Sequence, residues 1–400
     1  MKQNLSIIIT KLEGGGAERM ASNLSILLSE KYNVFLIVFD STEIKYPYEG
    51  QLIDLNIPAS NNSLSRLLNL YKRVKLVRKI KKEFNIHYSI SLLDGPNIVN
   101  ILSKSNDKII ISVRNRLSYF IKSSLKRFRI RFLYSQADTI VSLSKEVERD
   151  LVDEFKIKSE LISTIYNSCD VDHITKLANE PLEDNYKDLF DNYEVIVTVG
   201  RLEEQKAHWH LIRAFKKVKQ SRPNTKLLIF GKGSLEHKLK QLVLDLELEE
   251  DVIFGGYVKN TFKYVSRSQL FAFSSIVEGL GNVILEAMAC GVPVVSTDCV
   301  AGPREIISPS TDIRSRANNI EHGEYGLLTP VCDGIMHDSS FELTKEESFL
   351  AQAVLEILDN ETVKEKYRKA SRNRITDFSP EVISTMWTDI IGGEKNVYHN

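Results

Sequence analysis

The chain has 400 residues, of which 42% are hydrophobic and 26% are charged, a composition typical of soluble globular proteins. Its 53 Lys and Arg residues balance 53 Asp and Glu residues, so the chain has no net positive charge that would indicate nucleic-acid binding. The first 180 residues carry 27 basic and 20 acidic residues, which makes this the basic half. No apolar run approaches 18 residues, so neither a membrane span nor a signal peptide is expected.

Short runs rich in Ile and Val alternate with longer helical stretches. The first series is LSIIIT, NVFLIVF, YSISLL, KIIISV and DTIVSLS, and the second is EVIVTVG, TKLLIFGKG, DVIFGGYV, LFAFSS and VPVVST. This alternation is typical of parallel sheets covered on both faces. It predicts two doubly wound α/β domains, 1–175 and 193–376, with a linker at 176–192 and a ligand cleft between the domains. Residues 377–400 hold a helix that is a candidate to dock back on the N-terminal domain.

Two polar segments, 298–326 and 331–347, are longer than ordinary connections. Their length predicts loops that line a site. The four cysteines, Cys169, Cys290, Cys299 and Cys332, form no C-x-x-C pair. This spacing indicates neither a disulfide framework nor a structural metal, and it fits a reducing cytoplasm.

A glycine-rich turn, Gly14 to Gly16, lies between the first strand and the first helix. Glycines there let backbone amides approach an anion at the helix N-terminus. The dinucleotide fingerprint fails, because Arg19 stands at its third glycine, and the P-loop lysine is absent. The turn is therefore either an anion site or a tight connection without a ligand.

Two cations, Arg201 and Lys206, follow the strand that ends at Gly200. Cations at the carboxyl end of a parallel strand suit a diphosphate, although an isolated pair also fits an ordinary surface. Glu278 precedes the sequence GLGN, which opens a helix near Asn282 or Val283, and Glu286 falls within an apolar run on that helix. A buried carboxylate needs a partner, and sugar hydroxyls are one candidate.

The chain resembles the family-4 glycosyltransferases of the GT-B fold. The resemblance rests on GGGAER, VGRLEEQK, LLIFGKG, VIFGGYV, EGLGNVILEAMACGVPVVSTD, AGPREII and GEYGLLTP, which follow the family's order. It implies two Rossmann-like domains and a nucleotide diphosphate sugar as donor. Glu286 would then hold the ribose, Glu278 the transferred sugar, and Arg201 and Lys206 the departing diphosphate.

The resemblance also implies backbone contacts with the donor. They are expected for the distal phosphate and sugar at Gly281, Asn282 and Val283, for the base at Gly256, Tyr257 and Val258, and for the phosphates at Gly15 and Gly16. Many relatives carry a His after a strand of the KIIISV type, where this chain has Arg114 and Asn115. Two interpretations of Arg114 remain open: it contacts a phosphate or sugar oxygen, or it pairs with an acid such as Asp94.

The family implies transfer with retention of the anomeric configuration, by front-face displacement. Positive charge from Arg, Lys and helix ends replaces a metal, so we expect no metal, no other cofactor and activity that survives chelation. The sequence CDVDHI contains Asp170 and Asp172 at the spacing of a metal-binding D-x-D, but a solvated linker is expected there.

Two helices of the first half are basic and amphipathic. Residues 65–84 hold eight cations and one acid, and a second basic helix follows from Tyr119. Such helices suit an anionic membrane surface, or they are ordinary helices that pack their apolar face on the sheet. We expect a hexosyltransferase at the cytoplasmic face of the plasma membrane, with a lipid-linked glycan acceptor of capsule, exopolysaccharide or O-antigen synthesis. A sugar-nucleotide epimerase of the same fold and a non-catalytic sugar-nucleotide binding protein are the alternatives.

Overall fold

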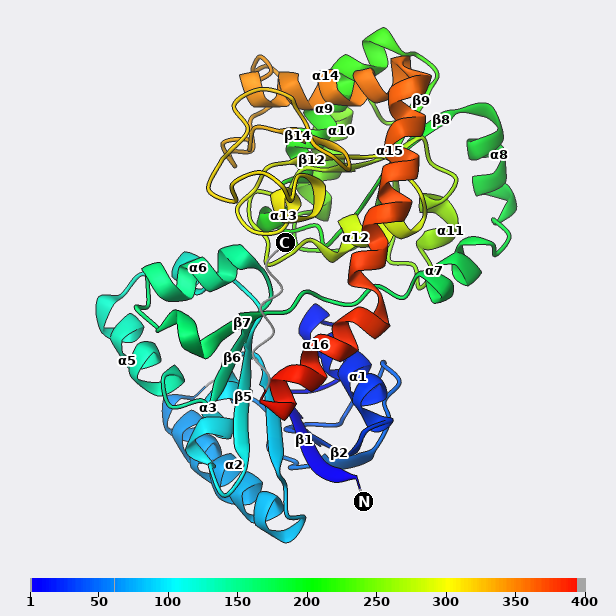
Figure 1. Cartoon of the computed structure of the whole chain (residues 1–400). Coiled ribbons are helices and arrows are strands. Elements are labelled where there is room, and N and C mark those ends of the chain that lie inside the picture. Colours follow the sequence, from blue (N-terminus) through cyan, green and yellow to red (C-terminus); the bar gives the residue numbers. More distant parts are fainter. Residues whose placement is uncertain (1, 61, 394–400) are drawn as a thin grey trace. The chain divides into compact units, whose positions relative to one another are not determined.

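The computed structural model describes residues 2–60 and 62–393, which form two compact units. The first unit contains the described residues up to Asn167 together with those from Pro380 onward, and the second runs from Ser168 to Ser379. Each unit is built on one seven-stranded sheet with helices on both faces (Figure 1). The doubly wound α/β fold predicted for both halves is therefore confirmed.

The N-terminal sheet is entirely parallel and has the order β3-β2-β1-β4-β5-β6-β7. Strand β1 pairs with β2 on one side and with β4 on the other, so the strand order reverses beside β1. Ligands of open α/β sheets bind at such a reversal, outside the carboxyl ends of the strands. The strands are β1 (Gln3–Ile9), β2 (Tyr32–Val38), β3 (Gln51–Asp54), β4 (Tyr88–Leu92), β5 (Lys108–Val113), β6 (Thr139–Ser142) and β7 (Ile162–Thr164).

Alternate side chains of these strands enter two separate cores. Ile7 and Ile9 pack with residues of α1 and α16, whereas Ile8 packs with residues of α2 and α3 on the opposite face, as the two-residue period of a strand requires. The helices of the unit are α1 (Gly16–Ser29), α2 (Ser63–Glu83), α3 (Asp94–Leu102), α4 (Leu117–Phe120), α5 (Ser124–Tyr134), α6 (Lys145–Asp153) and α16 (Pro380–Gly392).

Helix α16 belongs to the N-terminal unit although it ends the described chain. Its Ile383 and Trp387 are fully buried in the same core as Met20 and Leu24 of α1, and the two helices lie side by side (Figure 1). The Lys108 ammonium also donates to the carbonyl of Ile390 at 2.7 Å. This is the docking for which 377–400 was a candidate, and the part of that range beyond Gly393 lies outside the described residues.

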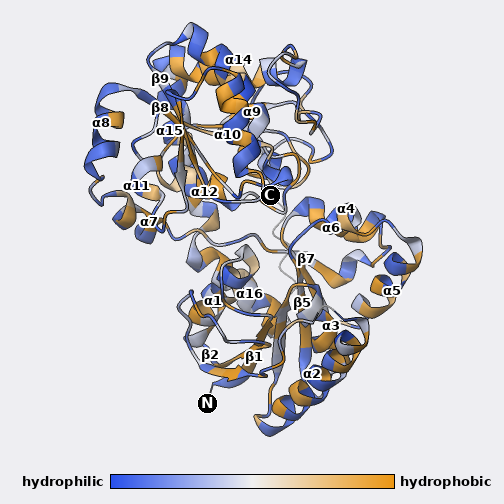
Figure 2. Ribbon diagram, turned by 180° about the vertical axis from the view of Figure 1, so that it is seen from behind, coloured by the Kyte–Doolittle hydropathy of each residue, from blue (hydrophilic) through white to orange (hydrophobic). Residues whose placement is uncertain are grey.

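The C-terminal sheet has the order β10-β9-β8-β11-β12-β14-β13, and only the β13–β14 pair is antiparallel. Figure 2 shows the apolar strands at the centre of this unit, with mixed polar and apolar helices around them. The strands are β8 (Glu194–Val199), β9 (Thr225–Phe230), β10 (Val252–Gly256), β11 (Leu270–Phe273), β12 (Val294–Thr297), β13 (Glu321–His322) and β14 (Leu327–Thr329). The helices are α7 (Val171–Ala178), α8 (Asp184–Asn192), α9 (His208–Ser221), α10 (Glu236–Asp245), α11 (Phe262–Val265), α12 (Asn282–Ala289), α13 (Pro303–Ile307), α14 (Lys345–Asp359) and α15 (Glu361–Arg374).

The linker predicted at 176–192 is wrong, because these residues complete α7 and form α8 of the C-terminal unit. The Asp170 side chain accepts from the amide of His173 at 2.9 Å and caps α7. The CDVDHI acids are exposed, as expected, but they begin a helix of the C-terminal unit. In α8, Leu189 is buried and the ring of Tyr186 lies 4.7 Å from that of Tyr264. The polar composition of the segment thus reflects the exposed faces of two amphipathic helices.

Candidate functional site

The candidate donor site lies at the carboxyl edge of the C-terminal sheet, beside β8. Strand β8 pairs with β9 on one side and with β11 on the other, so the strand order reverses here as it does beside β1. The connection after β8 carries Arg201 and Lys206, and the connection after β11 carries Glu278. The residues predicted from their order in the sequence therefore follow neighbouring strands at the reversal.

Hydrogen bonds hold these two connections together. The Gln205 side chain donates to the carbonyl of Val277 at 2.8 Å, and the amide of Ile276 donates to the carbonyl of Gln205 at 3.0 Å. The Ser274 hydroxyl donates to the carbonyl of Lys206 at 3.0 Å. Three bonds thus fix the backbone on either side of the charged side chains.

Lys206 and Glu278 form an ion pair, with 2.5 Å between Nζ and Oε1. The Lys206 ammonium also lies 5.3 Å from the centre of the Phe273 ring, within the range of a cation–π contact. Both side chains are largely buried, with 15% and 8% of their surface exposed. The sequence predicted both residues for the site but neither their pairing nor the contribution of Phe273.

The backbone around Arg201 is closely packed against glycines of the next connection. A Cβ atom on Gly231 would lie 1.8 Å from the carbonyl oxygen of Gly200, and one on Gly233 would lie 2.3 Å from that of Leu202. Neither position has room for a side chain. The Arg201 side chain is exposed to solvent beside this packed backbone, so its guanidinium is accessible to a ligand.

Helix α12 begins at Asn282, as predicted, with Gly281 as its N-cap at φ +88°. This left-handed conformation favours glycine. Glu286 lies in the second turn and is half-buried, while its neighbours Leu285 and Ala287 are buried. The apolar run containing Glu286 is thus a helix with one face in the core, and Glu286 lies outside that fully buried face. Val283 is also half-buried.

The turn after β10 carries the residues predicted to flank the base. Gly256 ends the strand at φ +65°, and its carbonyl accepts from the amide of Gly231 at 2.8 Å. Tyr257 is 74% exposed, and Val258 is half-buried beside it. This turn therefore borders the connection after β9 at the same edge of the sheet.

The glycine turn of the N-terminal unit already has an anion, the carboxylate of Glu18. Glu18 Oε2 accepts from the amides of Glu13, Gly14 and Gly15 at 3.1, 2.8 and 2.9 Å. The amide of Gly15, predicted to contact donor phosphates, is thus directed at its own helix. Glu18 is the third helical residue, a position at which Glu satisfies the free amides of a helix start. The three-residue spacing between Gly15 and Glu18 is visible in the sequence, but the glycines alone do not indicate that Glu18 accepts from their amides.

Arg114 is buried after β5. Its guanidinium donates to the hydroxyl of Ser112 at 3.3 Å and to the side-chain oxygen of Asn167, and burial lowers its pKa to about 9. Asp94 instead accepts from the Tyr134 hydroxyl at 2.9 Å, and burial raises the pKa of this carboxyl. The structure thus gives Arg114 neutral partners, while Asn115 is exposed.

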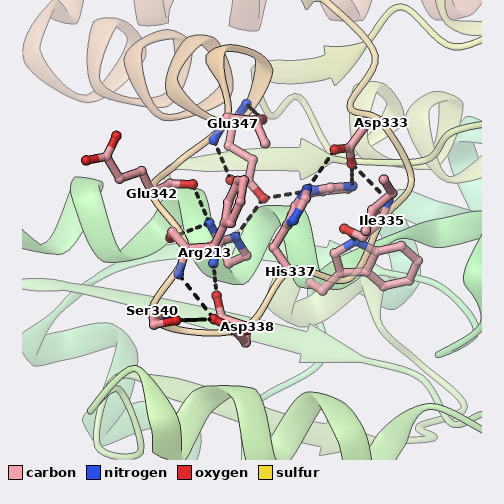
Figure 3. A network of polar contacts seen from close by, with 12 residues as sticks. Arg213, Asp333, Ile335, His337, Asp338, Ser340, Glu342 and Glu347 are labelled. Carbon is pink, nitrogen blue, oxygen red and sulfur yellow. Dashed lines mark hydrogen bonds and ion pairs between the residues drawn. The ribbon is translucent and has the colours of Figure 1, made fainter.

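The polar segment after β14 is tied to α9 and α14 by Arg213 (Figure 3). The Arg213 Nε donates to Glu347 Oε1 at 2.9 Å, and its other nitrogens donate to three carbonyls at 2.5–3.0 Å, those of Asp338, Phe341 and Glu342. His210 lies between Glu347 and Asp333, with 2.8 Å from Nδ1 to Oε1 and 3.4 Å from Nε2 to Oδ1. This segment is therefore anchored from within the unit.

The other predicted loop, 298–326, contains α13 and β13 and is organised by Arg304. This guanidinium donates to Asp298 and Glu321 at 2.6 and 2.7 Å. Among the residues that the structure describes, no group of three or more His, Cys, Asp or Glu side chains is arranged for a metal ion. No described helix is both long enough and apolar enough to cross a bilayer, and no disulfide joins the four cysteines.

Comparison with known proteins gives consistent matches for both units. The model of the family described as Glycosyltransferase Family 4 matches residues 14–173, and that of Glycosyl transferases group 1 matches residues 180–315. An uncharacterized glycosyltransferase of Methanocaldococcus jannaschii is 33% identical over 383 residues, which cover 92% of this chain and 94% of the relative.

A Campylobacter jejuni relative is 30% identical, with 94% of this chain and 96% of the relative covered. It is named N-acetylgalactosamine-N,N'-diacetylbacillosaminyl-diphospho-undecaprenol 4-alpha-N-acetylgalactosaminyltransferase. Among solved structures, Anabaena HepE in complex with UDP and glucose has a TM-score of 0.74 at 18% identity, with 98% of this chain and 100% of that chain covered. At that identity the likeness shows the fold.

Proposed function

Because the chain belongs to the family-4, group 1 glycosyltransferases, which transfer a sugar from a nucleotide sugar, we propose that its donor is a UDP-linked hexose or N-acetylhexosamine and its acceptor a lipid-linked glycan of bacterial surface-polysaccharide synthesis. The acceptor class is supported by the Campylobacter relative, whose name specifies a diphospho-undecaprenol glycan. A Staphylococcus aureus relative, 23% identical, is named as a capsular polysaccharide biosynthesis glycosyltransferase. The observation that carries the site assignment is the Lys206–Glu278 pair at the strand reversal beside β8.

The charges of Lys206 and Glu278 compensate each other in their ion pair. A donor diphosphate competes for the ammonium, and the hydroxyls of the transferred sugar become partners of the released carboxylate. Arg201, exposed on the same connection, adds a second cation, and a guanidinium contacts two phosphate oxygens at once. Glu286 on α12 is assigned to the ribose hydroxyls, and Gly256, Tyr257 and Val258 flank the base.

The start of α12 is assigned to the distal phosphate and the sugar, through the backbone of Gly281, Asn282 and Val283. Amides at a helix N-terminus favour negative charge. In the N-terminal unit, Glu18 uses the amide of Gly15, so Gly16 is the residue of the turn that is left for the phosphates. Arg114 is bonded to Ser112 and Asn167, and this favours a role in shaping the acceptor side over direct contact.

The proposed reaction retains the anomeric configuration. The acceptor oxygen forms a bond to the anomeric carbon on the face from which the diphosphate leaves, the bond between that carbon and the phosphate oxygen breaks, and the acceptor proton passes to the leaving oxygen. Lys206 and Arg201 stabilise the charge that develops on the diphosphate, so catalysis relies on electrostatics and positioning. No step requires a metal ion.

The reaction is proposed to take place at the cytoplasmic face of the plasma membrane. A lipid-linked acceptor lies at a membrane surface, and exposed cations of α2 and α5 suit anionic lipid. Among these exposed cations are Lys72, Lys75, Lys79, Lys82, Lys126, Arg129 and Arg131.

Transfer is tested by incubating the full chain with UDP-sugars and a short-chain polyprenyl-diphosphate glycan in detergent. Mass spectrometry reports transfer, and NMR of the product reports the anomeric configuration. A glycosylated acceptor with the donor's configuration is expected. An isomerised nucleotide sugar would indicate an epimerase, and donor binding without any product would indicate a sensor. Inversion of configuration would contradict the proposed displacement.

A further inference from the structure

Two chain segments of the N-terminal unit lack acidic residues altogether. Residues 55–82 and 108–137 each contain eight Lys or Arg and no Asp or Glu. The first segment supplies most of α2, and the second supplies α4 and α5. Both α2 and α5 contact α3, so these helices form one layer of the unit (Figure 2).

Helix α2 carries a stripe of apolar side chains that face solvent. Leu64, Leu67, Leu68 and Tyr71 are each 51–67% exposed. They are spaced at i, i+3, i+4 and i+7, which places them on one face of a helix. The side of α2 that packs on the core is formed by other residues, among them Val77.

Helices α4 and α5 carry a second exposed apolar group. Phe120, Leu125, Phe128 and Phe132 are 59–68% exposed. Leu125, Phe128 and Phe132 follow the spacing i, i+3 and i+7 on α5, whereas Tyr134 of the same helix is buried in the core. An ordinary surface helix has one apolar face, which packs on the sheet. Helix α5 has a second apolar face, and this face is exposed.

The cations beside these stripes divide into two kinds. Four cations of α2 serve the fold. Lys81 forms a fully buried ion pair with Asp107 at 2.8 Å, and the other three donate to backbone carbonyls: Arg66 to Ser60, Arg73 to Ile57 and Arg78 to Leu102. Four other lysines of α2 are exposed and form no salt bridge with a described residue: Lys72, Lys75, Lys79 and Lys82. Lys126, Arg129 and Arg131 are similarly exposed on α5.

We propose that the exposed apolar stripes of α2 and α4–α5 insert into the interface of an anionic lipid bilayer, with the flanking cations at the lipid headgroups. Apolar burial and attraction to anionic lipid add together in such helices. The absence of acidic side chains over both segments favours this occupant over a second copy of the same surface, which would place like charges together. Membrane insertion adds to the proposed function. Its biological purpose rests on the proposed lipid-linked acceptor, but the insertion itself does not.

Vesicle flotation of the full chain, without donor or acceptor, tests the insertion. Vesicles of phosphatidylcholine with 30% phosphatidylglycerol are compared with pure phosphatidylcholine, at low and at high NaCl. We expect binding to the anionic vesicles that weakens at high salt but persists, because salt screens the charges and leaves apolar burial in place. Binding that vanishes at high salt, or no binding at all, would overturn the insertion.

Substitutions separate the apolar contribution from that of the charges. The double substitution Phe128→Ser, Phe132→Ser is expected to lower the partition coefficient by about tenfold or more at both salt concentrations, and so is Leu67→Ser, Tyr71→Ser. Leu244→Ser is the matched control, because Leu244 is 53% exposed on α10 of the other unit, and it should leave binding unchanged. Equal binding by the serine variants and the wild type would contradict insertion.

A spectroscopic readout covers the case in which a serine variant fails to fold. Phe128→Trp places an indole at the proposed interface, and both native tryptophans, Trp209 and Trp387, are buried. Its emission should shift to the blue on vesicle addition and be quenched by brominated lipid; no change would contradict the proposal.

Two further measurements identify the other outcomes. A dimer in sedimentation that the Phe128→Ser, Phe132→Ser variant abolishes, without vesicle binding, would assign the surface to a second copy of the chain. Vesicle binding with no sugar transfer would support the insertion and count against the proposed function. Sugar transfer in detergent without vesicle binding would support the proposed function and count against the insertion.

Discussion

Replacing Arg213 by Met should destabilise the C-terminal unit strongly. The Arg213 side chain is 1% exposed and that of Glu347 is 0% exposed, and they form an ion pair at 2.9 Å. Removal of one partner from a buried pair leaves the other charge uncompensated, which costs about 3–5 kcal/mol. Three backbone carbonyls also lose their donor, while Glu347 keeps the amide of Thr344 at 3.0 Å and His210. We therefore expect a loss of about 4 kcal/mol in the free energy of unfolding.

The double substitution Arg213→Met, Glu347→Met separates the pair from the loss of packing. It removes both charges, so it should cost less than the two single substitutions together, with a coupling of about 2 kcal/mol. Arg222→Met is a matched control at the C-terminal end of the same helix, since Arg222 pairs with Glu194 at 2.6 Å but is 30% exposed. An exposed pair of this kind contributes about 1 kcal/mol or less.

Urea unfolding followed by circular dichroism measures these differences, and limited proteolysis reports on the segment that Arg213 holds. The Arg213→Met chain should also be cleaved faster within 331–343 than the wild type. The reasoning is refuted if Arg213→Met lies within about 1 kcal/mol of the wild type or if its effect equals that of Arg222→Met. Strictly additive effects in the double substitution would show that the pair itself contributes nothing.

Four further predictions concern the donor site and its surroundings. Arg201→Ala and Lys206→Ala should each lower turnover by roughly 10²-fold or more, and near-normal turnover in both would reject their assignment to the diphosphate. Activity should persist in EDTA; its loss, with recovery on adding Mg²⁺ or Mn²⁺, would contradict the metal-free mechanism. Gly231→Ala should reduce soluble yield and melting temperature, because its Cβ would lie 1.8 Å from a backbone oxygen at φ +141°; an unchanged melting temperature would show that the backbone moves aside. Burial, and to a lesser extent the charge of Lys206, lowers the pKa of His208 to about 3, which is below the value in the unfolded chain. The unfolded chain therefore binds the proton more strongly, and the free energy of unfolding falls as the pH drops from about 6.5 toward 3. His208→Leu should remove about 2 kcal/mol of this loss at pH 5, as measured by urea unfolding at pH 7 and pH 5.

The longer strands, and the fact that the candidate site residues directly follow them, could be predicted from local sequence because these signals are local. A run such as EVIVTV is apolar at nearly every position, and this predicts a strand buried on both faces, as β8 is. Polar residues that directly follow such strands gather at one edge of a parallel sheet. Lys206 and Glu278 both follow such strands, and the family resemblance assigns them to the same donor. The short strands β3, β7, β13 and β14 were missed, because two to four half-polar residues carry no such pattern.

Pairings between distant residues did not follow from the sequence. Arg213 and Glu347 are separated by 134 positions, and nothing near either residue indicates its partner. The basic helix posed a related problem, since periodicity shows which residues share a face but not whether that face is covered. Lys81 proved to be buried against Asp107, whereas Leu67 and Tyr71 proved to be exposed. Only the packing of neighbouring elements decides these cases.

The way in which the proposed donor site is held suggests an origin for the catalytic effect assigned to its charges. Lys206 and Glu278 lie on connections joined by three hydrogen bonds, and the next connection packs so closely that Gly231 and Gly233 admit no Cβ. Charges on such a backbone need little rearrangement when a diphosphate departs, and preorganised charges of this kind usually contribute more to catalysis than any other single effect. A substitution that loosens the connections without touching either charge, such as Gln205→Ala, should therefore lower turnover more than it weakens donor binding. Equal effects on both would indicate that the hydrogen bonds serve donor binding rather than the transition state.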